Sequence, residues 1–351
     1  MAQEAFDLID LLARERSLPL IDYARLISSF DEAGVAEYAA ELARGKRREV
    51  YGDIVFVRGL IEISNICGND CYYCGIRKSN AHCQRYALSD QEILDCCQEG
   101  YQLGLRTFVL QGGESGAYSV ERICRLAHDI KTSFVDCSLT LSLGEYHYAA
   151  YQAMKQAGAD RYLLRHETAN AAHYALLHPG SMSFSNRMRC LRDLKALGFQ
   201  AGCGMMVGSP GQTHDILAED LKFIEEYAPE MCGIGPFIPH SQTPFAQHPA
   251  GSLSLTAFLL SLLRLMHPNV LLPATTALGS LEEGGREKGI LSGANVVMPN
   301  LSPPALRERY SLYNNKLSSG AESAQNLEEL RQRIASAGCA MSLKKGDHLP
   351  L

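Results

Sequence analysis

The chain has 351 residues, a formal net charge of −6 at pH 7 and 46% hydrophobic residues. This length and apolar fraction suffice for one large core or two modest ones. The negative net charge argues against electrostatic binding to nucleic acid or to an anionic membrane surface. Most of the 12 cysteines are single and lie in apolar stretches, which is not the disulfide framework of a small secreted domain.

The start of the chain does not have the pattern of a secretion signal. Residues 1–30 carry acidic side chains early and have no long uncharged apolar core. The most apolar run, Leu253 to Met266, is short for a membrane span and contains Arg264, so we predict a buried helix there. We expect a cytoplasmic protein that binds neither membrane nor nucleic acid.

In chain order, the first 50 residues are predicted to form helices that close the bottom of the main domain. From residue 54 onward, short apolar runs alternate with amphipathic stretches, the pattern of strands alternating with helices. The predicted strands span 55–64, 107–111, 138–143, 162–165, 202–207, 233–238, 270–275 and 295–298. The helices predicted between them span 90–103, 120–132, 148–157, 186–197, 216–227 and 255–265. Ser89-Asp90-Gln91-Glu92 has the sequence of a helix N-cap.

Eight strand–helix units in about 250 residues match the size of a (β/α)8 TIM-type barrel. An open doubly wound sheet is the alternative, but its Gly-rich dinucleotide fingerprint is not found in the sequence. We therefore predict an α/β chain with a helical segment at 1–50, a barrel at 51–313, and a C-terminal helix and tail at 314–351. The last helix is predicted at 327–337, and residues 344–351 are expected to be frayed.

Three cysteines in one short polar loop are the strongest functional signal. Cys67, Cys71 and Cys74 are separated by three and two residues, and the aromatic Tyr73 precedes the last of them. Three thiolates can hold three irons of a 4Fe–4S cluster, and the fourth iron then has no protein ligand. An open iron of this kind can chelate a small molecule.

Two other interpretations of these cysteines stay open. They could be part of a structural zinc site, with Cys83 or His82 as the fourth ligand. They could also be buried thiols without a chemical role. A zinc ribbon normally has a second pair of cysteines, and the sequence has none. The loop is also too polar and glycine-flanked for a buried trio, so the cluster is favoured.

Polar residues gather where the predicted strands end, which is where a barrel places its chemistry. Gly112, Gly113 and Glu114 end the second strand. Paired glycines let the backbone approach a ligand, and the carboxylate can accept from an ammonium group. Arg165 and Glu167 end the fourth strand, where the arginine could bind an anion and the glutamate an amine or a ribose.

Further candidates follow later strands. Arg187 opens a helix and could pair with a carboxylate, although a surface arginine is a serious alternative. Gly208 lies in a strand-to-helix turn. The residues that we expect to face the inside of the barrel near the last strand ends are Thr275, Thr276, Met298 and Tyr310. Adjacent threonines are more often explained by β-propensity, so their position in the barrel supports this expectation.

The three-cysteine loop and the Gly-Gly-Glu segment one strand later resemble the motifs of the radical S-adenosylmethionine (SAM) enzymes. Within that superfamily, longer strings are similar to the HydE family of FeFe hydrogenase maturases. The strings lie at 141–145, 162–170, 233–240, 273–277 and 293–300, and the likeness runs from about residue 55 to residue 313. Biotin synthase and methylornithine synthase share the barrel and the cysteine loop but match these strings less well.

The resemblance implies roles for the candidate residues. Cys67, Cys71 and Cys74 would hold the 4Fe–4S cluster, whose reduction cleaves SAM to methionine and a 5′-deoxyadenosyl radical. The residues that would contact SAM are Tyr73, Gly112, Gly113, Glu114, Glu167, Arg187 and Gly208. The residues that would line the substrate cavity are Thr140, Arg165, Thr275, Thr276, Met298 and Tyr310.

The implied substrate is a small cysteine-bound iron carbonyl–cyanide unit, on its way to the di-iron part of the hydrogenase cofactor. An electron donor such as ferredoxin or flavodoxin and the other hydrogenase maturases are the implied partners. Some family members carry a further cysteine group near the C-terminus that holds a second cluster. Here 302–338 contains no cysteine and Cys339 is alone, so we predict a single cluster.

Two other functions remain as alternatives. One is a radical SAM enzyme of small-molecule metabolism, like biotin synthase or methylornithine synthase. A biotin synthase should supply a second cluster from its barrel strands, and no arginine-plus-three-cysteine set is evident here. The other is a zinc-stabilised barrel that only binds a ligand or a partner.

Overall fold

The structure is a computed structural model that describes residues 2–350. Its α-helices are α1 (Ala2–Glu15), α2 (Leu20–Ser28), α3 (Val35–Tyr51), α4 (Asp90–Gln102), α5 (Val120–Ser133), α6 (Tyr148–Gln156), α7 (Ala171–Leu177), α8 (Phe184–Ala196), α9 (His214–Tyr227), α10 (Leu253–Met266), α11 (Thr276–Leu281), α12 (Gly285–Leu291) and α13 (Leu327–Ser336). Its strands are β1 (Ile54–Val57), β2 (Gly59–Ser64), β3 (Thr107–Gly112), β4 (Ser138–Ser142), β5 (Arg161–Leu163), β6 (Gln200–Cys203), β7 (Met206–Val207), β8 (Met231–Cys232), β9 (Gly235–Pro236), β10 (Val296–Val297) and β11 (Ala340–Ser342). Short 3-10 helices lie at η1 (Pro304–Arg309), η2 (Gly320–Glu322) and η3 (Ala324–Asn326).

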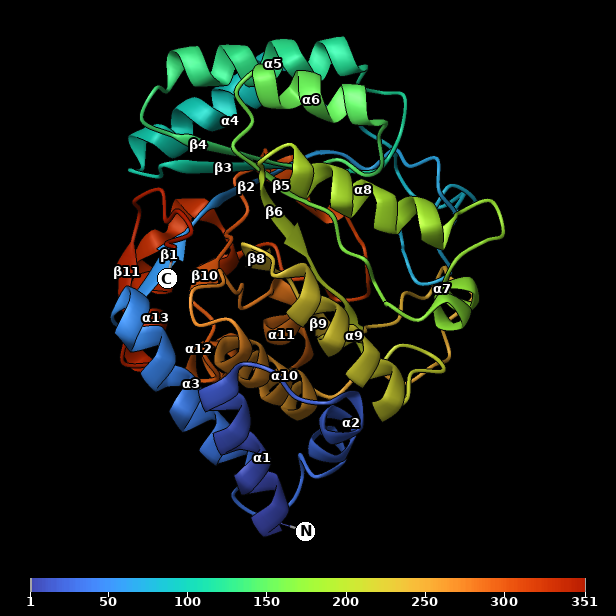
Figure 1. Cartoon of the computed structure of the whole chain (residues 1–351). Coiled ribbons are helices and arrows are strands. Elements are labelled where there is room, and N and C mark those ends of the chain that lie inside the picture. The colour runs from blue at the N-terminus through green and yellow to red at the C-terminus, as the bar shows by residue number, and fades with distance from the viewer. Residues whose placement is uncertain (1, 351) are drawn as a thin grey trace.

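The strands form a closed parallel ring, as predicted for a TIM-type barrel. Six of them pair in the order β2-β3-β4-β5-β6-β8 (Figure 1). Single parallel bridges continue the ring from Met231 to Leu271 and from Pro273 to Val296. A last bridge joins Asn300 to Leu60 of β2. The ring therefore has eight positions, two of which are extended segments with little regular strand.

Several predicted strands differ from the observed ones. The run 55–64 is two strands, because β1 pairs with β10 and β11 whereas β2 pairs with β3. The run 270–275 is not a regular strand, because it bonds to its neighbours only through the bridges of Leu271 and Pro273. The runs 202–207 and 233–238 are each divided into a barrel strand and a short strand that pairs separately, β7 with β9.

The predicted helices are confirmed to within a few residues. Ser89 caps α4 in a capping box, since its hydroxyl accepts from Glu92 N (3.2 Å) and the Glu92 carboxylate accepts from Ser89 N (2.7 Å). The apolar run of α10 is a buried helix, as expected. Between residues 2 and 350, none of the helices combines the length and the apolarity that crossing a bilayer requires.

The last residues of the chain are ordered against the barrel, so the predicted frayed tail is wrong for 344–350; Leu351 lies outside the described residues. Thr107 Oγ1, at the start of β3, donates to Lys345 O (2.9 Å). Arg161, at the start of β5, donates to Asp347 Oδ1 (2.5 Å). Backbone groups of the tail thus replace water at the N-terminal strand ends. The tail, more than the N-terminal helices, closes the floor of the barrel.

The N-terminal helices instead cover the outside of the barrel. α1 and α3 pack on α10, and α2 packs on α9 (Figure 1). Within residues 2–350, α3 is the N-terminal helix whose end contacts the tail at the floor. There Tyr51 OH donates to Asn269 O (2.6 Å) and accepts from Leu349 N (3.3 Å). The division of the chain into 1–50, 51–313 and 314–351 stays a prediction.

Candidate active site

The cysteine loop begins directly after β2 and is held by backbone bonds. Cys74 N donates to Cys71 O (3.3 Å), which closes a turn within the loop. Arg85 fastens the loop from behind, because its guanidinium donates to the carbonyl oxygens of Asn65 (2.6 Å) and Ile76 (2.7 Å). The backbone is therefore fixed without using the three thiols, all of which are reduced.

Burial raises the pKa of all three thiols, that of Cys71 to about 12. Thiols in this setting ionise only when a cation compensates the charge, and iron supplies such a charge. Within residues 2–350, no three His, Cys, Asp or Glu side chains converge on one point that would suit a single metal ion. A 4Fe–4S cluster binds each cysteine through a different iron, so its ligands need not share one point.

The Gly-Gly-Glu segment at the end of β3 lies against the cysteine loop. Gly68 N donates to Glu114 O (2.6 Å). A Cβ at Gly113 would overlap the carbonyl oxygen of Ile66 and lie 2.9 Å from Cys67 Cβ, so a larger residue does not fit. Burial raises the pKa of Glu114. The segment predicted to contact SAM is thus adjacent to the predicted cluster ligands.

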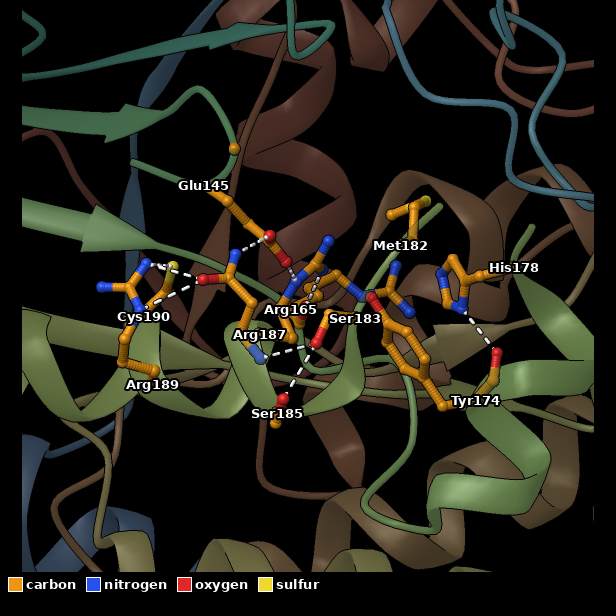
Figure 2. Close-up of polar contacts among 12 residues, drawn as sticks. Glu145, Arg165, Tyr174, His178, Met182, Ser183, Ser185, Arg187, Arg189 and Cys190 are labelled. Atoms are coloured by element: carbon orange, nitrogen blue, oxygen red, sulfur yellow. Dashed lines mark hydrogen bonds and ion pairs between the residues drawn. The ribbon is translucent and has the colours of Figure 1, made fainter. Parts of the chain in front are cut away.

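Arg187 of α8 is buried between two strand ends instead of lying on the surface. Its Nε donates to Glu145 Oε1 (2.5 Å) and its Nη1 to Arg165 O (2.6 Å). In Figure 2 the Arg187 side chain lies between these two residues, with dashed lines for the bonds. Asn186 holds the other oxygen of the same carboxylate (2.5 Å). The guanidinium has further N–H donors that can face a ligand.

Glu167 adopts a backbone conformation that is unfavourable for a side chain of its size. Its φ is 67°, in the left-handed region, which costs about 1–3 kcal/mol and is typical of functional sites. Its N donates to Gly204 O (3.0 Å). Its carboxylate lies 3.1 Å from Arg165 Nη2, an ion pair that lacks good hydrogen-bond geometry.

A buried histidine and a buried carboxylate behind this strand end hold the strained backbone. His166 and Asp220 are both 0% exposed, with Nε2 and Oδ1 3.5 Å apart. His166 Nδ1 accepts from Gly204 N (3.2 Å), so Nε2 carries the proton that points at the carboxylate. Asp220 also accepts from Ala169 N. The pair fixes the residues on both sides of Glu167, which explains His166 as a structural histidine.

Tyr73 is held by a neutral histidine. Its hydroxyl lies 3.2 Å from His178 Nε2, and His178 Nδ1 lies 2.9 Å from Tyr174 O, a bond drawn in Figure 2. Because a carbonyl only accepts, Nδ1 carries the proton and Nε2 accepts from the tyrosine. Burial lowers the pKa of His178 to about 4, so the ring is neutral at pH 7.

Gly208 lies in a tight turn after β7, with φ at 77°. Gln212 closes the turn by accepting from Gly208 N (2.6 Å) and donating to Met206 O (2.9 Å). A Cβ at Gly208 would lie 2.5 Å from Gly251 Cα. The turn therefore exposes bare backbone, which is the kind of surface that a flat ring can approach.

The inside of the ring is not filled at its upper end. Arg165 and Met298 point inward yet stay partly exposed, whereas the outward Leu141 and Tyr162 are 0% exposed. A Cβ added at Gly233 would meet one heavy atom within 4 Å, at 3.9 Å. These observations indicate loose packing inside the barrel at the C-terminal strand ends, where we place the predicted substrate cavity.

Several buried polar atoms at this end of the barrel lack a protein hydrogen bond, although Arg165 and Glu167 form an ion pair with each other. Within the described part of the chain, the buried atoms that lack a hydrogen bond include Thr140 Oγ1, Arg165 Nε and Nη2, Glu167 Oε2 and Thr275 Oγ1. Leaving such a group unpaired costs about 1–3 kcal/mol. Native proteins pair nearly all buried polar groups, so these atoms indicate the place of a polar ligand.

The other predicted cavity residues have protein partners. Thr276 Oγ1 donates to Glu322 Oε2 (3.0 Å), whereas the hydroxyl of the adjacent Thr275 has no hydrogen-bond partner within residues 2–350. Tyr310 OH accepts from Gln111 Nε2 (3.3 Å). Met298 packs against an apolar group that includes Met231 and Leu271.

Sequence reasoning missed three residues of this region. Glu145 follows β4 at a strand end, so the rule that found Glu167 would have found it. His178 lies after α7, a helix too short to give a periodic pattern. Glu62 of β2 is fully buried and accepts from Lys316 (2.6 Å), a partner 254 residues away that no local pattern reveals.

Comparison with known proteins identifies a superfamily profile and several similar sequences. The profile of the radical SAM superfamily matches residues 61–224. The FeFe hydrogenase maturase subunit HydE of Thermotoga maritima is 45% identical over 289 residues, 82% of each chain. The 3-methylornithine synthase of Methanosarcina acetivorans is 25% identical over 319 residues, 90% of this chain and 89% of that one.

Among solved structures, the crystal structure of methylornithine synthase (PylB) has a TM-score of 0.83 at 24% identity. It covers 95% of this chain and 97% of its own. At this identity the match supports the fold and does not extend to the substrate. The fold prediction is confirmed.

The implied cofactors fit the residues present. Three reduced thiols share one fixed loop, and Glu167 Oε2 and Arg165 Nε are buried polar atoms for which the described residues offer no hydrogen-bond partner. A 4Fe–4S cluster and SAM are the cofactors of the superfamily. The sequence identity to the maturase exceeds 40% over most of both chains, so the assignment can be narrowed from the superfamily to one family. The chain belongs to the HydE family of FeFe hydrogenase maturases, within the radical SAM enzymes.

Proposed function

We propose that this protein cleaves SAM reductively and uses the radical on a small substrate during assembly of the di-iron subcluster of FeFe hydrogenase. One observation carries the proposal: the three-cysteine loop after β2 shares an end of the barrel with Arg165 Nε, Glu167 Oε2 and Thr275 Oγ1, buried atoms that lack a hydrogen bond within residues 2–350. In this proposal Cys67, Cys71 and Cys74 bind a single 4Fe–4S cluster.

The chain's own residues would place SAM beside that cluster. When bound, the reduced cluster and SAM supply a 5′-deoxyadenosyl radical. Gly112 and Gly113 let the backbone approach, and Glu114 and Glu167 offer carboxylates for the amine and the ribose. The remaining contacts that we propose come from Tyr73, Arg187 and Gly208.

The substrate would bind deeper in the barrel. Arg165 offers N–H donors, and Thr140 and Thr275 offer hydroxyls. This set suits a small anionic or strongly polar substrate, such as a cysteine-bound iron carbonyl–cyanide unit. Thr276, Met298 and Tyr310 would complete the wall.

Enclosure protects the reaction. A carbon radical attacks most C–H bonds that it meets, so the site has to exclude water and other reactants. The strand ring surrounds the cavity, and the tail closes the floor. An electron donor such as ferredoxin or flavodoxin and other maturases are the proposed partners, and a cytoplasmic location stays a prediction.

The test is anaerobic reconstitution with iron and sulfide, followed by reduction with dithionite in the presence of SAM. We expect 5′-deoxyadenosine from the wild type and none from Cys71→Ser. Cys83→Ser is the matched control, because Cys83 lies in the same loop but outside the proposed ligands. Loss of activity in the control, or zinc in place of iron, would contradict the ligand assignment.

The role in maturation needs a second assay. Purified protein is added to a maturation mixture that contains the other maturases and a hydrogenase without its cofactor, and hydrogen evolution is measured. We expect activity with the wild type and background with Cys71→Ser. Cleavage of SAM without any maturation would favour an enzyme of small-molecule metabolism.

A further inference from the structure

One segment of the chain crosses the C-terminal end of the barrel, opposite the floor. It spans 311–317, lies between η1 and η2 and contains no helix or strand. We call it the crossing segment. It bonds to residues that follow three separate positions of the strand ring, in the cysteine loop, after β9 and in α11. The bonds join Gly75 N to Leu312 O (2.8 Å), Asn314 N to Pro239 O (3.1 Å) and Leu317 N to Ser280 Oγ (3.1 Å).

Lys316 extends from the crossing segment into the ring. Its Nζ donates to Glu62 Oε1 (2.6 Å), and the two side chains are 10% and 0% exposed. The sheet register aligns Ile61 with Leu110 and Leu141, which face outward, so the neighbouring Glu62 faces the inside of the ring. The lysine therefore reaches past the strand ends to a carboxylate inside the barrel.

The pair of Lys316 and Glu62 lies next to the predicted substrate cavity. Lys316 Nζ is 5.4 Å from the ring centroid of Tyr310, a predicted cavity residue. The second oxygen of Glu62 accepts from Asn300 Nδ2 (2.7 Å), which fixes the carboxylate. A buried ion pair gives little net stability over two apolar side chains, yet loss of one partner is strongly unfavourable. The particular effect of this pair is thus to keep the crossing segment down against the ring.

The crossing segment is held more loosely than the other parts that enclose the barrel. The tail bonds to Arg161 at the floor, and Arg85 holds the cysteine loop through several carbonyl oxygens. Within residues 2–350 the crossing segment takes part in no strand pairing, and its bonds to the neighbouring loops are few. Segments with few such bonds are the ones that open most readily.

We propose that the crossing segment is a lid over the predicted substrate cavity, and that Lys316 closes the lid by pairing with Glu62. The proposal rests on the proposed function, which places a small substrate inside the ring. That substrate has to pass one end of the barrel, and the tail closes the floor. When Lys316 leaves Glu62, the segment can lift and the substrate can enter. When the pair forms again, water is excluded while the radical exists.

Hydrogen–deuterium exchange measures the opening of the lid without any turnover. The variant Lys316→Ala removes the contact with Glu62. The matched control is Lys131→Ala, because Lys131 pairs with Asp160 (2.9 Å) just before β5, at the floor end of the barrel. Exchange is followed by mass spectrometry in the reconstituted holoenzymes, in peptides of the crossing segment and of β11.

We expect the amides of Asn314 and Leu317 in the wild type to exchange at least about tenfold faster than those of β11, relative to their intrinsic rates, since local opening sets the rate. In Lys316→Ala their exchange should rise at least about tenfold further, because a buried ion pair is lost. The control should leave exchange of the crossing segment unchanged. Equal exchange of this segment in Lys316→Ala and the wild type would overturn the lid.

A second variant covers the case in which Lys316→Ala does not fold. Glu62→Gln keeps an oxygen for Asn300 and removes the charge that attracts Lys316. Exchange of the crossing segment should rise at least about threefold, with β11 unchanged. A rise of the same size in β11 would contradict the lid, because it would mean that the pair supports the whole fold.

Enclosure of the radical gives a second readout. In the maturation mixture, the amount of 5′-deoxyadenosine formed per hydrogenase matured should rise at least about threefold in Lys316→Ala, since an open site lets the radical react elsewhere. Lys131→Ala should keep the wild-type ratio. An unchanged ratio in Lys316→Ala would count against the lid. Absence of 5′-deoxyadenosine from the wild type would instead overturn the proposed function, whereas the exchange experiment tests the lid by itself.

Discussion

The two ends of the barrel use the same residue type in opposite ways. On β5 and just after it, Arg161 and Arg165 both point into the ring, one at the floor and one at the cavity. Arg161 is 0% exposed and donates to Asp347 (2.5 Å) and Lys345 O (3.0 Å). The side chain of Arg165 is 33% exposed, and within the described chain its Nε has no hydrogen-bond partner.

The comparison teaches that an inward arginine is not by itself a sign of function. Burying a charge without compensation is costly, so each buried arginine needs a partner. At the floor the tail supplies that partner, and the arginine joins two parts of the fold. At the upper end Arg165 has only a loose ion pair with Glu167 among the described residues, and its Nε is left for a ligand. The location of the partner separates the structural residue from the functional one.

The largest expected effect is at the floor. Asp347→Ala leaves Arg161 and Arg58 as neighbouring buried cations, so we expect the free energy of unfolding to fall by about 3 kcal/mol. Asp136→Ala is the matched control: its carboxylate is equally exposed, but it pairs with the accessible Arg106. The control should lose less than about 1 kcal/mol. Urea denaturation of the metal-free proteins measures the free energy of unfolding of both variants. Equal losses would show that the ion pair of Arg161 with Asp347 does not stabilise the floor of the barrel.

The upper end should instead show a pH dependence. The pKa of His178 is about 4 when folded, against 6.5 as the ordinary value. Below pH 6.5 the unfolded chain binds more protons, so stability falls as the pH drops toward 4 and is level above 6.5. The contribution of His178 is on the order of 3 kcal/mol.

His178→Gln isolates this term from the other buried histidines. In urea denaturation of the metal-free protein, the stability difference between wild type and variant should change steadily between pH 6.5 and pH 4.5. A difference that is constant over this range would mean that His178 is not buried as a neutral ring.

At the cavity, Arg165→Met should affect turnover more than stability. The free energy of unfolding should change by less than about 1 kcal/mol, because the ion pair of Arg165 with Glu167 is partly exposed and lacks hydrogen-bond geometry. Hydrogenase maturation should fall about thirtyfold, the value of roughly 2 kcal/mol for a hydrogen bond to a charged group. Arg165→Lys should recover part of this loss. A variant that unfolds easily would place Arg165 with Arg161 as a structural residue.

The smallest expected change in stability tests whether there is room inside the barrel at Gly233. Gly233→Ala should change the free energy of unfolding by less than about 0.5 kcal/mol, since its Cβ has room. Gly204→Ala is the contrast, because its Cβ would overlap Gly233 O, and it should cost about 2 kcal/mol. Denaturation midpoints compare the two. A large penalty at Gly233 would show that the barrel interior is filled.

Local sequence signals predicted much of this molecule. The alternation of apolar runs and helices gave the barrel, and Ser89 with Glu92 marked a helix start that the structure confirms. The cysteine spacing and the strand-end rule pointed to the loop and to Glu114 and Glu167, which lie near one another around Arg187 and the cysteines. These signals are local because each depends on residues within one turn or one strand.

What could not be predicted depends on distant partners. Nothing near residue 58 shows that a strand changes its neighbours there, since β1 needs β10 and β11. The ordered tail depends on Arg161, 186 residues earlier. The pair of Glu62 and Lys316 is likewise a product of the fold. Such contacts have no sequence periodicity.

The pairing of β1 with β11 also has a consequence for how the protein is made. β1 and Arg58 leave the ribosome early, but Gly346, which binds Arg58, is 288 residues later. At about 5–20 residues per second this interval lasts roughly 15–60 s. During that time the edge of β1 is unpaired, because β11 has not been synthesised. Arg58 and Arg161 likewise lack Gly346 and Asp347, the tail residues that bind them. The barrel can close its floor only late in translation, so until then the edge of β1 is open to pairing with other chains.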